Sequence, residues 1–291
     1  MNIRDCVCYG VVFLFYCSNL FSNTLNLNYP FNYKLYFTNV KCWIVQECQG
    51  PLKDKPQGYM AKGLEVLLSA ASYSIDGAIY GVRNQTWFLS TLNIVKQKGV
   101  NVRLVVDQKD GYLGDWGNLL NFYYLDTPKL VDILGYDFVK PDVSTSGDIL
   151  KYSIMHNKFF VVDNQYVWLG TANISDTDMG ADYNANLSIV ISSKELATIY
   201  KKEFEQMFSY NRFSKFKISN KQPVLNFLDG TILSIYFSPQ DAAIVSGIIP
   251  FINSAKKSLD IAMFYFTHPQ VATEEFNANK RKVKERKKLY S

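Results

Sequence analysis

The sequence predicts an α/β fold with a largely buried sheet, followed by an incomplete second copy of the same arrangement. Helix-like and strand-like apolar runs alternate between residues 61 and 107, and part of this pattern returns about 184 residues later. The chain has 291 residues, of which 48% are apolar and 20% are charged. It is therefore long enough to bury a substantial core, and its composition is typical of a globular protein.

The N-terminal residues have the pattern of an export signal. After a short polar start, the apolar run Val7–Cys17 has the length of a signal-peptide core and is too short to cross a membrane comfortably. Ser18 and Ser22 are small enough for cleavage nearby. We therefore predict that residues 1–23 are a signal peptide and that the protein is exported to a periplasmic, extracellular or membrane-attached location. The alternative is a buried first strand in a cytoplasmic protein.

Residues 24–60 form a lead-in segment rich in Asn, Tyr and Pro, with one short strand expected at Leu35–Val40. Cys42 and Cys48 lie in this segment, and they are the only cysteines that a processed, exported chain would keep. A disulfide between them is one option in an oxidising compartment. No further cysteine or histidine is nearby in the sequence, so a zinc site is not expected.

Residues 61–107 show the clearest alternation of helices and strands. Leu64, Leu67 and Leu68 follow helical spacing, whereas Val100–Asp107 is a strongly apolar strand. Gly99 stands where a glycine commonly ends a helix. In chain order, the sequence predicts a helix at 61–72, a strand at 74–82, a helix at 86–98, a strand at 100–107, a short helix at 128–134, a strand at 136–139, a hairpin centred near residue 164, a strand at 184–191 and a helix at 194–210.

The second copy begins after residue 220. The segment VSGIIPFINSAKKSLDIAMFYF (245–266) aligns with AKGLEVLLSAASYSIDGAIYGV (61–82), and a strand at Thr231–Phe237 would correspond to Leu35–Val40. The counterpart of the later apolar strand is KRKVKERKKLYS (280–291), which has lost the glycine and the apolar residues. We therefore expect one helix and one strand in the second copy, while a second helix is left open.

Basic residues are concentrated near the C-terminal end. Residues 280–288 hold seven basic residues and one acidic residue, whereas the whole chain has 31 basic and 26 acidic residues. The rest of the chain is therefore close to neutral, which argues against a dedicated nucleic-acid grip. The tail could contact phosphates or anionic lipid, but a solvated end of the truncated repeat (222–291) is the simpler interpretation.

His156 and Lys158 stand at the start of the predicted hairpin. Side chains alternate along a strand, so both lie on one face. The turn signal is DNQ, and a hairpin centred near Asn164 would place residue 172 opposite His156, with Thr171 and Asn173 on either side of that position. A bulge or a slip of one residue would bring either of them onto the face of the histidine, so the sequence leaves the register open. An imidazole, an ammonium, a hydroxyl and a carboxamide therefore gather at one end of the hairpin.

This set of groups suits a phosphodiester. An imidazole can attack phosphorus or move protons near neutral pH. Ammonium and amide groups can hold the non-bridging oxygens as negative charge builds, and the hydroxyl can orient a partner or bind a phosphate oxygen. The sequence offers no cluster of metal-binding residues at these positions, so we predict a site that works without a metal or a cofactor.

The spacing H-x-K-x4-D-x6-G-T-x-N, which runs from His156 to Asn173, resembles the HKD motif of the phospholipase D superfamily. Met155, the strand at 184–191 and the helix at 194–210 are also similar to that family. The resemblance covers roughly residues 60–270. It implies a phospholipase D-like mixed sheet flanked by helices in residues 61–215, with two HKD motifs meeting at one site.

In that family, one histidine becomes a phosphohistidine and the other protonates the leaving group. The resemblance therefore implies a role for each member of the motif in this chain: His156 is the nucleophile or the acid, Lys158 and Asn173 bind phosphate, Thr171 supports them, and Asp163 belongs to the catalytic motif with a chiefly structural part.

Two features depart from the family pattern. Asn184-Ala185-Asn186 stands where many members have N-x-E-N, so a site carboxylate is absent and Asn184 is left as a partial substitute on the substrate side. A second HKD motif is also missing, because His268 is followed by Gln270 rather than by a lysine.

Two functions are therefore open. The first is a phospholipase D-like phosphodiesterase that hydrolyses phospholipid or nucleic acid through a phosphohistidine, with a homodimer completing the site. The second is a catalytically incomplete half-site protein that binds phosphate-containing ligands without turnover. Apolar stretches at Tyr112–Trp116 and Phe122–Leu125 suit contact with a membrane surface, although core packing is the simpler interpretation.

Overall fold

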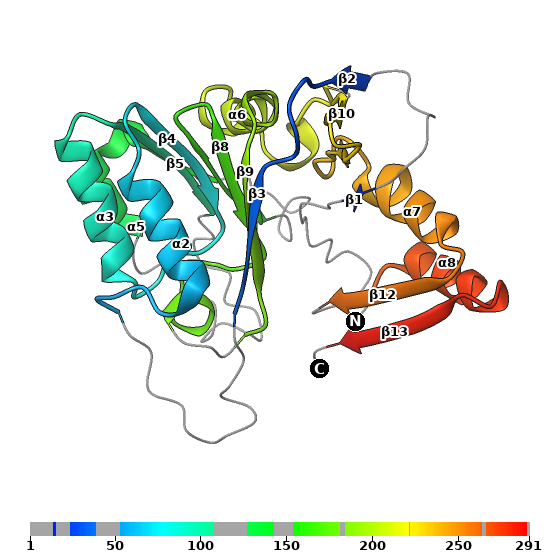
Figure 1. Cartoon of the computed structure of the whole chain (residues 1–291). Helices are drawn as coiled ribbons and strands as arrows, with labels where there is room; N and C mark the ends of the chain where they lie inside the picture. The colour runs from blue at the N-terminus through cyan, green and yellow to red at the C-terminus, as the bar shows by residue number, and fades with distance from the viewer. Residues whose placement is uncertain are drawn as a thin grey trace. The chain divides into compact units, whose positions relative to one another are not determined.

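The structure, a computed structural model, describes residues 14–15, 24–38, 53–107, 127–142, 154–180, 184–220, 222–263 and 266–289. It divides into two compact units (Figure 1). The described part of unit 1 runs over Phe31–Ile218, and unit 2 combines Val11–Pro30 with Ser219–Ser291. Each unit has its own sheet and helices.

A seven-stranded mixed sheet forms the centre of unit 1, as predicted. Its order is β3-β9-β8-β7-β4-β5-β6. β5 pairs in parallel with both β4 and β6, whereas β7 is antiparallel to both of its neighbours, β4 and β8. The strands are β3 (Tyr33–Phe37), β4 (Ser74–Ile79), β5 (Asn101–Asp107), β6 (Val139–Asp142), β7 (Lys158–Val162), β8 (Tyr166–Gly170) and β9 (Leu187–Ser192). β6 begins later than the strand predicted at 136–139, because a 3-10 turn occupies Tyr136–Phe138.

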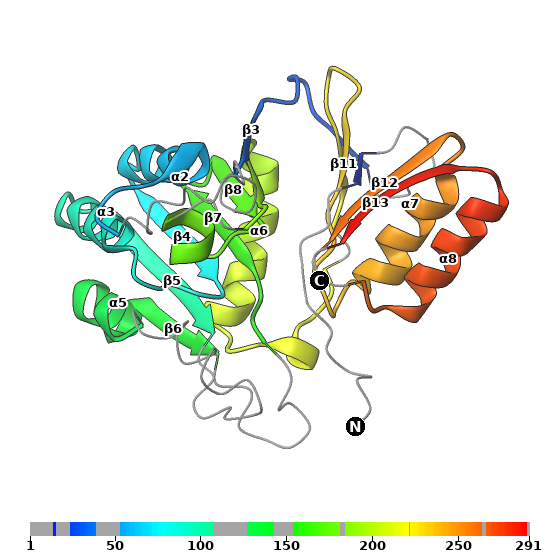
Figure 2. The same ribbon diagram turned by 90° about the horizontal axis from the view of Figure 1, so that it is seen from below.

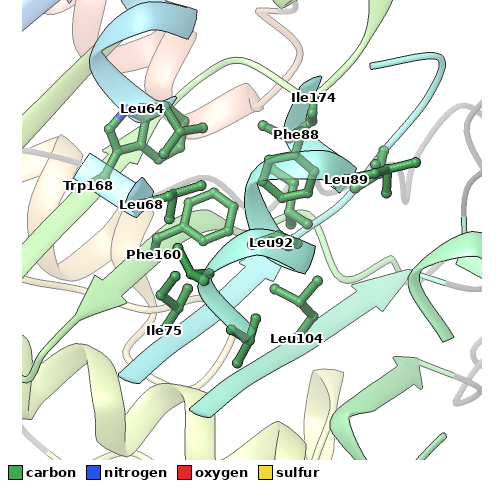
Figure 3. Close-up of a cluster of buried hydrophobic side chains, with 14 of the residues drawn as sticks. Leu64, Leu68, Ile75, Phe88, Leu89, Leu92, Leu104, Phe160, Trp168 and Ile174 are labelled. Atoms are coloured by element: carbon green, nitrogen blue, oxygen red, sulfur yellow. The ribbon is translucent and has the colours of Figure 1, made fainter. Parts of the chain in front are cut away.

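Helices cover both faces of this sheet. One face carries α2 (Gly58–Ser69), α3 (Thr86–Gln97) and α5 (Thr127–Leu134), and the other carries α6 (Lys194–Phe208) (Figures 1 and 2). The three-helix side holds a large apolar core, because the helical apolar stripes meet the inward side chains of the strands. Figure 3 shows part of this core, including Leu64, Leu68, Ile75, Phe88, Leu92, Leu104, Phe160 and Trp168.

Two glycines mark places where a side chain does not fit. A Cβ at Gly77 of β4 would lie 2.6 Å from two ring carbons of Phe160, so the phenylalanine ring fills the space that a side chain would need. Gly99 follows α3 with a φ of +89°, the left-handed conformation that glycine adopts without strain. The predicted helix end at Gly99 is confirmed.

Unit 2 contains a small sheet and an α/β piece. The sheet has the order β1-β11-β10-β2, formed by β1 (Leu14–Phe15), β2 (Thr24–Asn26), β10 (Val224–Asn226) and β11 (Ile232–Ser234). The α/β piece consists of a π-helical turn (Ile244–Ile248), α7 (Ile249–Ser254), β12 (Ser258–Met263), α8 (Pro269–Lys280) and β13 (Lys284–Leu289).

The second copy is more complete than the sequence indicates. α8 follows β12 as α3 follows β4, and β13 pairs in parallel with β12 as β5 pairs with β4. The expectation of a missing second strand was therefore wrong, although the basic residues within 280–287 are exposed, as expected. The physical reason is that Lys284 and Arg286 of β13 point to solvent, so this strand needs few apolar residues. The strand predicted at Thr231–Phe237 forms as β11, but it joins β10 and β1 rather than the β12–β13 pair.

Other predictions fall outside the described residues. Of the predicted signal peptide only Leu14–Phe15 is described, and these two residues pair with β11. The five cysteines, including Cys42 and Cys48, and the segments 112–116 and 122–125 lie outside the description. Within the described ranges, none of the helices combines the length and the apolar character that crossing a membrane requires.

Candidate active site

The predicted site residues meet at one edge of the sheet in unit 1. β4, β5 and β8 end at this edge, and β7 and β9 begin there, as the parallel and antiparallel registers require. In α/β sheets, the edge at the carboxyl ends of the strands is where ligands commonly bind. His156 lies just before β7, Gly170 is the last residue of β8, and Thr171–Asn173 follow it. The structure fixes the register that the sequence left open, since Phe159 pairs with Leu169 around the turn at Asn164.

Lys158 is held almost entirely inside the protein beside His156. Its side chain is only 4% exposed, and its ammonium donates a hydrogen bond to the backbone oxygen of His156 (3.1 Å). The same ammonium lies 5.3 Å from the ring centroid of Tyr80, which also makes an edge contact with the imidazole (4.8 Å between centroids). The imidazole itself is half-buried. The buried ammonium of Lys158 therefore lies next to the half-buried His156.

Backbone hydrogen bonds fix the chain on both sides of His156. The carboxylate of Asp107, at the end of β5, accepts a hydrogen bond from the backbone N–H of Met155 (2.6 Å). The N–H of Tyr80 donates to the backbone oxygen of Asn157 (3.0 Å). Asp107 is 1% exposed, so it acts as an internal support for the histidine segment.

The Gly170–Asn173 segment turns sharply between β8 and β9. A Cβ at Gly170 would lie 2.8 Å from the backbone oxygen of Leu187, which explains why glycine occupies this position. Thr171 then locks the turn: its hydroxyl donates to the amide oxygen of Asn186 (2.8 Å) and accepts from the N–H of Leu187 (3.1 Å). The threonine hydroxyl therefore supports the segment that leads to Asn173.

Asp178 organises the rest of this loop. One of its carboxylate oxygens accepts from the backbone N–H of Asn173 (2.8 Å), and the other accepts from the side-chain amides of Asn184 (2.7 Å) and Asn186 (3.0 Å). The residue is 6% exposed. The amide oxygen of Asn173 is buried and has no hydrogen-bond partner among the described residues. An unpartnered buried acceptor is costly, and such groups concentrate at functional sites.

A second carboxylate ties this loop to the end of β4. Asp176 accepts hydrogen bonds from the side-chain amides of Asn84 (3.0 Å) and Gln85 (2.9 Å), and Gln85 in turn accepts from the indole of Trp87 (2.8 Å). The isolated bridge between Val82 and Ile174 joins the same two segments. The loop after β8 is therefore attached to both β4 and β9.

Asp163 lies away from this site. It follows β7, at the opposite edge of the sheet from His156. Its carboxylate accepts three backbone hydrogen bonds, from Ser72 (2.8 Å), Tyr73 (2.7 Å) and Ser74 (2.9 Å). The structure thus brings together His156, Lys158, Thr171, Asn173 and Asn184 at one sheet edge, whereas Asp163 lies in the turn between β7 and β8 and binds the connection between α2 and β4.

Three residues of the site were not selected from the sequence. Tyr80 and Asp107 end adjacent apolar strands, where a polar residue after an apolar run is a general signal of a site at a sheet edge. Asp178 lies in a polar run after the G-T-x-N segment, and nothing in its spacing predicted that it would bind Asn173, Asn184 and Asn186 together.

The arrangement can bind an anion and act on it. Lys158 supplies a fixed positive charge, the loop after β8 supplies amide groups, and His156 supplies a group that can attack or transfer a proton. No group of three or more metal-ligand side chains is found within the ranges that the structure describes.

Several known proteins are similar to this chain. Residues 64–208 match the family model described as "Cardiolipin synthase, PLD-like domain". A search of curated proteins found no match. Among solved structures, the chain is similar to the phospholipase D family member Nuc from Salmonella typhimurium (18% identity, TM-score 0.41, 62% of this chain and 95% of that one) and to NucT from Helicobacter pylori (17%, 0.41, 62% and 96%).

A third similar structure is polyphosphate kinase from Porphyromonas gingivalis (14% identity, TM-score 0.50, 89% of this chain). The chain spans 38% of the length of that protein, and the likeness is one of fold.

Proposed function

Residues 64–208 form a phospholipase D-like domain, so this chain belongs to the phospholipase D superfamily, and from that premise we propose that it is a phosphodiesterase acting through a phosphohistidine. The observation that carries the proposal is the meeting of His156, the buried Lys158 and the Gly170–Asn173 loop at one sheet edge. These groups lie at the adjoining ends of the two paired strands of one hairpin, so strand pairing keeps the segments that carry them close together.

In the proposed first step, the imidazole of His156 attacks phosphorus. A phosphorus–nitrogen bond forms, the bond from phosphorus to the leaving oxygen breaks, and a second imidazole donates the proton that the leaving oxygen takes up. Water then attacks the phosphohistidine, the second imidazole accepts its proton, and the phosphorus–nitrogen bond breaks. Lys158 and the amide of Asn173 stabilise the charge on the non-bridging oxygens in both steps.

The second imidazole is proposed to come from a second copy of the chain. The other histidine of the sequence, His268, stands at the N-terminus of α8 in unit 2 and is followed by Pro269 and Gln270, so it has no lysine two residues on. A homodimer that brings two His156 side chains to one phosphate would complete the site. The proposed substrate is a phosphodiester of a phospholipid or a nucleic acid, and the proposed location is outside the cytoplasm.

A non-catalytic half-site is the second candidate, and one observation favours it. Asn184-Ala185-Asn186 has no carboxylate where many family members have N-x-E-N, and the carboxylate of Asp178 accepts hydrogen bonds from Asn173, Asn184 and Asn186. Such a site would bind a phosphate-containing ligand without turnover.

Hydrolysis of bis(p-nitrophenyl) phosphate in EDTA tests the proposal. We expect turnover that His156→Ala abolishes and that His268→Ala, the matched control at the other histidine, leaves unchanged. EDTA should not reduce the rate. A folded wild-type protein without turnover would contradict the proposed enzymatic activity and favour the non-catalytic half-site. Calorimetry would then measure whether that half-site binds phosphate.

Mixing experiments test the shared site. Wild type and His156→Ala are combined in equal amounts and allowed to exchange subunits. A site that needs both imidazoles leaves about a quarter of the wild-type activity, because mixed dimers are inactive, whereas independent sites leave about half. If the mixture keeps half of the activity and a mass measurement shows that the protein is a monomer, the proposed dimeric site is contradicted.

A further inference from the structure

The two units repeat one ion pair at the same place in the same kind of strand pair. In unit 1, Asp76 of β4 is the register partner of Arg103 of β5, and their side chains form an ion pair at 2.7 Å. In unit 2, Asp260 of β12 is the register partner of Arg286 of β13, and their side chains form an ion pair at 2.6 Å. The repeat therefore extends from the order of elements to individual contacts.

In unit 1, α6 covers this ion pair. Glu205 of α6 binds the Arg103 guanidinium at 2.7 Å, and the rings of Phe204 and Phe208 each lie 4.9 Å from the guanidinium carbon. Asp76 is consequently 1% exposed. The cover thus combines one carboxylate with two aromatic rings on one helical face.

In unit 2, the described residues leave the same ion pair open to solvent. The side chain of Asp260 is 52% exposed and that of Arg286 is 73% exposed. The other face of the strand pair packs on α7 and α8, where Leu259 and Val271 share a small core (Figures 1 and 2). The open face therefore corresponds to the face that α6 covers in unit 1.

The open face has kept the residues of the covered face. Ser258, Asp260 and Ala262 repeat Ser74, Asp76 and Ala78 at the same alternate positions of the strand. On the opposite side of the strand, by contrast, Gly77 is replaced by Ile261. A face that always meets water has no packing reason to keep a small alanine and a paired aspartate at these positions.

We propose that the outward face of β12–β13 is a docking surface for an amphipathic helix of a partner polypeptide, which presents a carboxylate flanked by aromatic rings to Arg286. The charge of the surface fits this partner, because Lys284 adds a second exposed cation beside Arg286. Covering the pair with an apolar helix face would strengthen its attraction by excluding water, as α6 does for Arg103.

A second copy of the chain cannot supply this helix from α6. Tyr200, Phe204 and Met207 of α6 are fully buried against the sheet of unit 1, so the face that carries them is already occupied. The partner helix must come from another polypeptide segment with the same chemistry.

The test appends to the full chain a helix that carries a carboxylate flanked by aromatic rings. Residues 193–210 are copied after Ser291 through a flexible Gly/Ser linker, which provides an effective concentration of the order of millimolar. Hydrogen exchange of residues 258–263 and 284–289 is compared with that of the chain carrying the linker alone. We expect exchange about fivefold slower or more in both strands, because a docked helix suppresses their local opening.

Charge reversal identifies the contact. Arg286→Glu should remove the protection, a lysine in place of the appended copy of Glu205 should also remove it, and the two changes together should restore it. Lys282→Glu, an exposed lysine beside β13 rather than in it, is the matched control and should have no effect. Circular dichroism checks that every variant is folded.

Four outcomes would overturn the proposal. Absence of protection by the appended helix is the first, and protection that survives Arg286→Glu is the second. The third is an Arg286-dependent, concentration-dependent protection in the chain without the appended helix, which would identify a second copy as the occupant. Arg286-dependent binding of a single-stranded oligonucleotide in place of the helix would likewise assign the face to nucleic acid.

Discussion

The strand pairs β4–β5 and β12–β13 share an order of elements, a parallel register and an ion pair, yet their surroundings differ. The pair in unit 1 is buried between helices on both faces, whereas the pair in unit 2 has helices on one face in the described residues. The comparison separates strand pairing from burial, which depend on different parts of the sequence. Local pairing is set by the strands themselves, but burial is set by segments far along the chain, such as β7 and α6.

The largest difference between the units should appear in their cores. Phe160 is fully buried between Phe88, Trp168 and Gly77, so Phe160→Ala should lower the free energy of unfolding by about 3–5 kcal/mol. Leu259 belongs to the smaller core of unit 2, and Leu259→Ala should cost about 2 kcal/mol. Urea unfolding measures both, with Val66→Ala on the exposed side of α2 as the control. Equal losses would contradict the difference in burial.

The ion pairs should differ next. Arg103→Met leaves the carboxylate of Asp76 buried, with Lys201 (3.8 Å) as its remaining ion-pair partner among the described residues, so we expect the free energy of unfolding to fall by about 3 kcal/mol. Arg286→Met exposes nothing that water does not already reach, so no measurable change in the melting temperature of unit 2 is expected. Thermal unfolding of the two variants, compared with wild type, measures this difference in stability. A loss in Arg286→Met as large as that in Arg103→Met would show that the second pair is buried in solution.

Asp163 offers a sharper test within unit 1. Asp163→Ala removes the acceptor of three backbone N–H groups, so the stability should fall by about 1–3 kcal/mol. The rate per folded molecule should stay within about twofold of wild type, because the residue lies at the opposite edge of the sheet from His156. Activity is measured well below the melting temperature of the variant. A loss of kcat comparable to that of His156→Ala would place Asp163 in the chemistry.

The smallest expected effect is a pH dependence that comes from Glu205, the carboxylate of α6 that binds Arg103. Burial acts to raise the pKa of Glu205, but hydrogen bonds from Arg103 and Ser209 outweigh it and hold the pKa below its ordinary value. The stabilisation is therefore present above the unfolded-state pKa of about 4.3 and is lost as the pH falls through the lower folded-state pKa.

The difference in unfolding free energy between wild type and Glu205→Gln measures this effect. It should be constant at neutral pH and should shrink below about pH 4. A difference that grows on acidification would contradict the direction of the pKa shift.

The sequence predicted the elements that rest on short-range patterns. The hairpin was predictable because two apolar runs flank a turn signal, whereas its register was left open and comes from the pairing of β7 with β8. The residues His156, Lys158, Thr171 and Asn173 could be selected because they lie on this hairpin or directly beside it.

The role of Asp178 could not be predicted, because it depends on how the loop between β8 and β9 folds back on Asn173, Asn184 and Asn186. β13 was missed for a related reason. Its charged residues gave no apolar alternation, and its pairing depends on β12, which lies a whole helix earlier in the chain.

The position of Asp163 bears on how such proteins are recognised. Asp163 has a positive φ (53°) in the turn after β7, and its carboxylate accepts a hydrogen bond from the backbone N–H of Ser74 at the start of β4. It therefore stabilises the fold rather than the site. A chain that has lost every reacting group would still gain stability from it. In this chain, the last letter of the HKD signature therefore belongs to the framework, and the proposed chemistry depends on the first two.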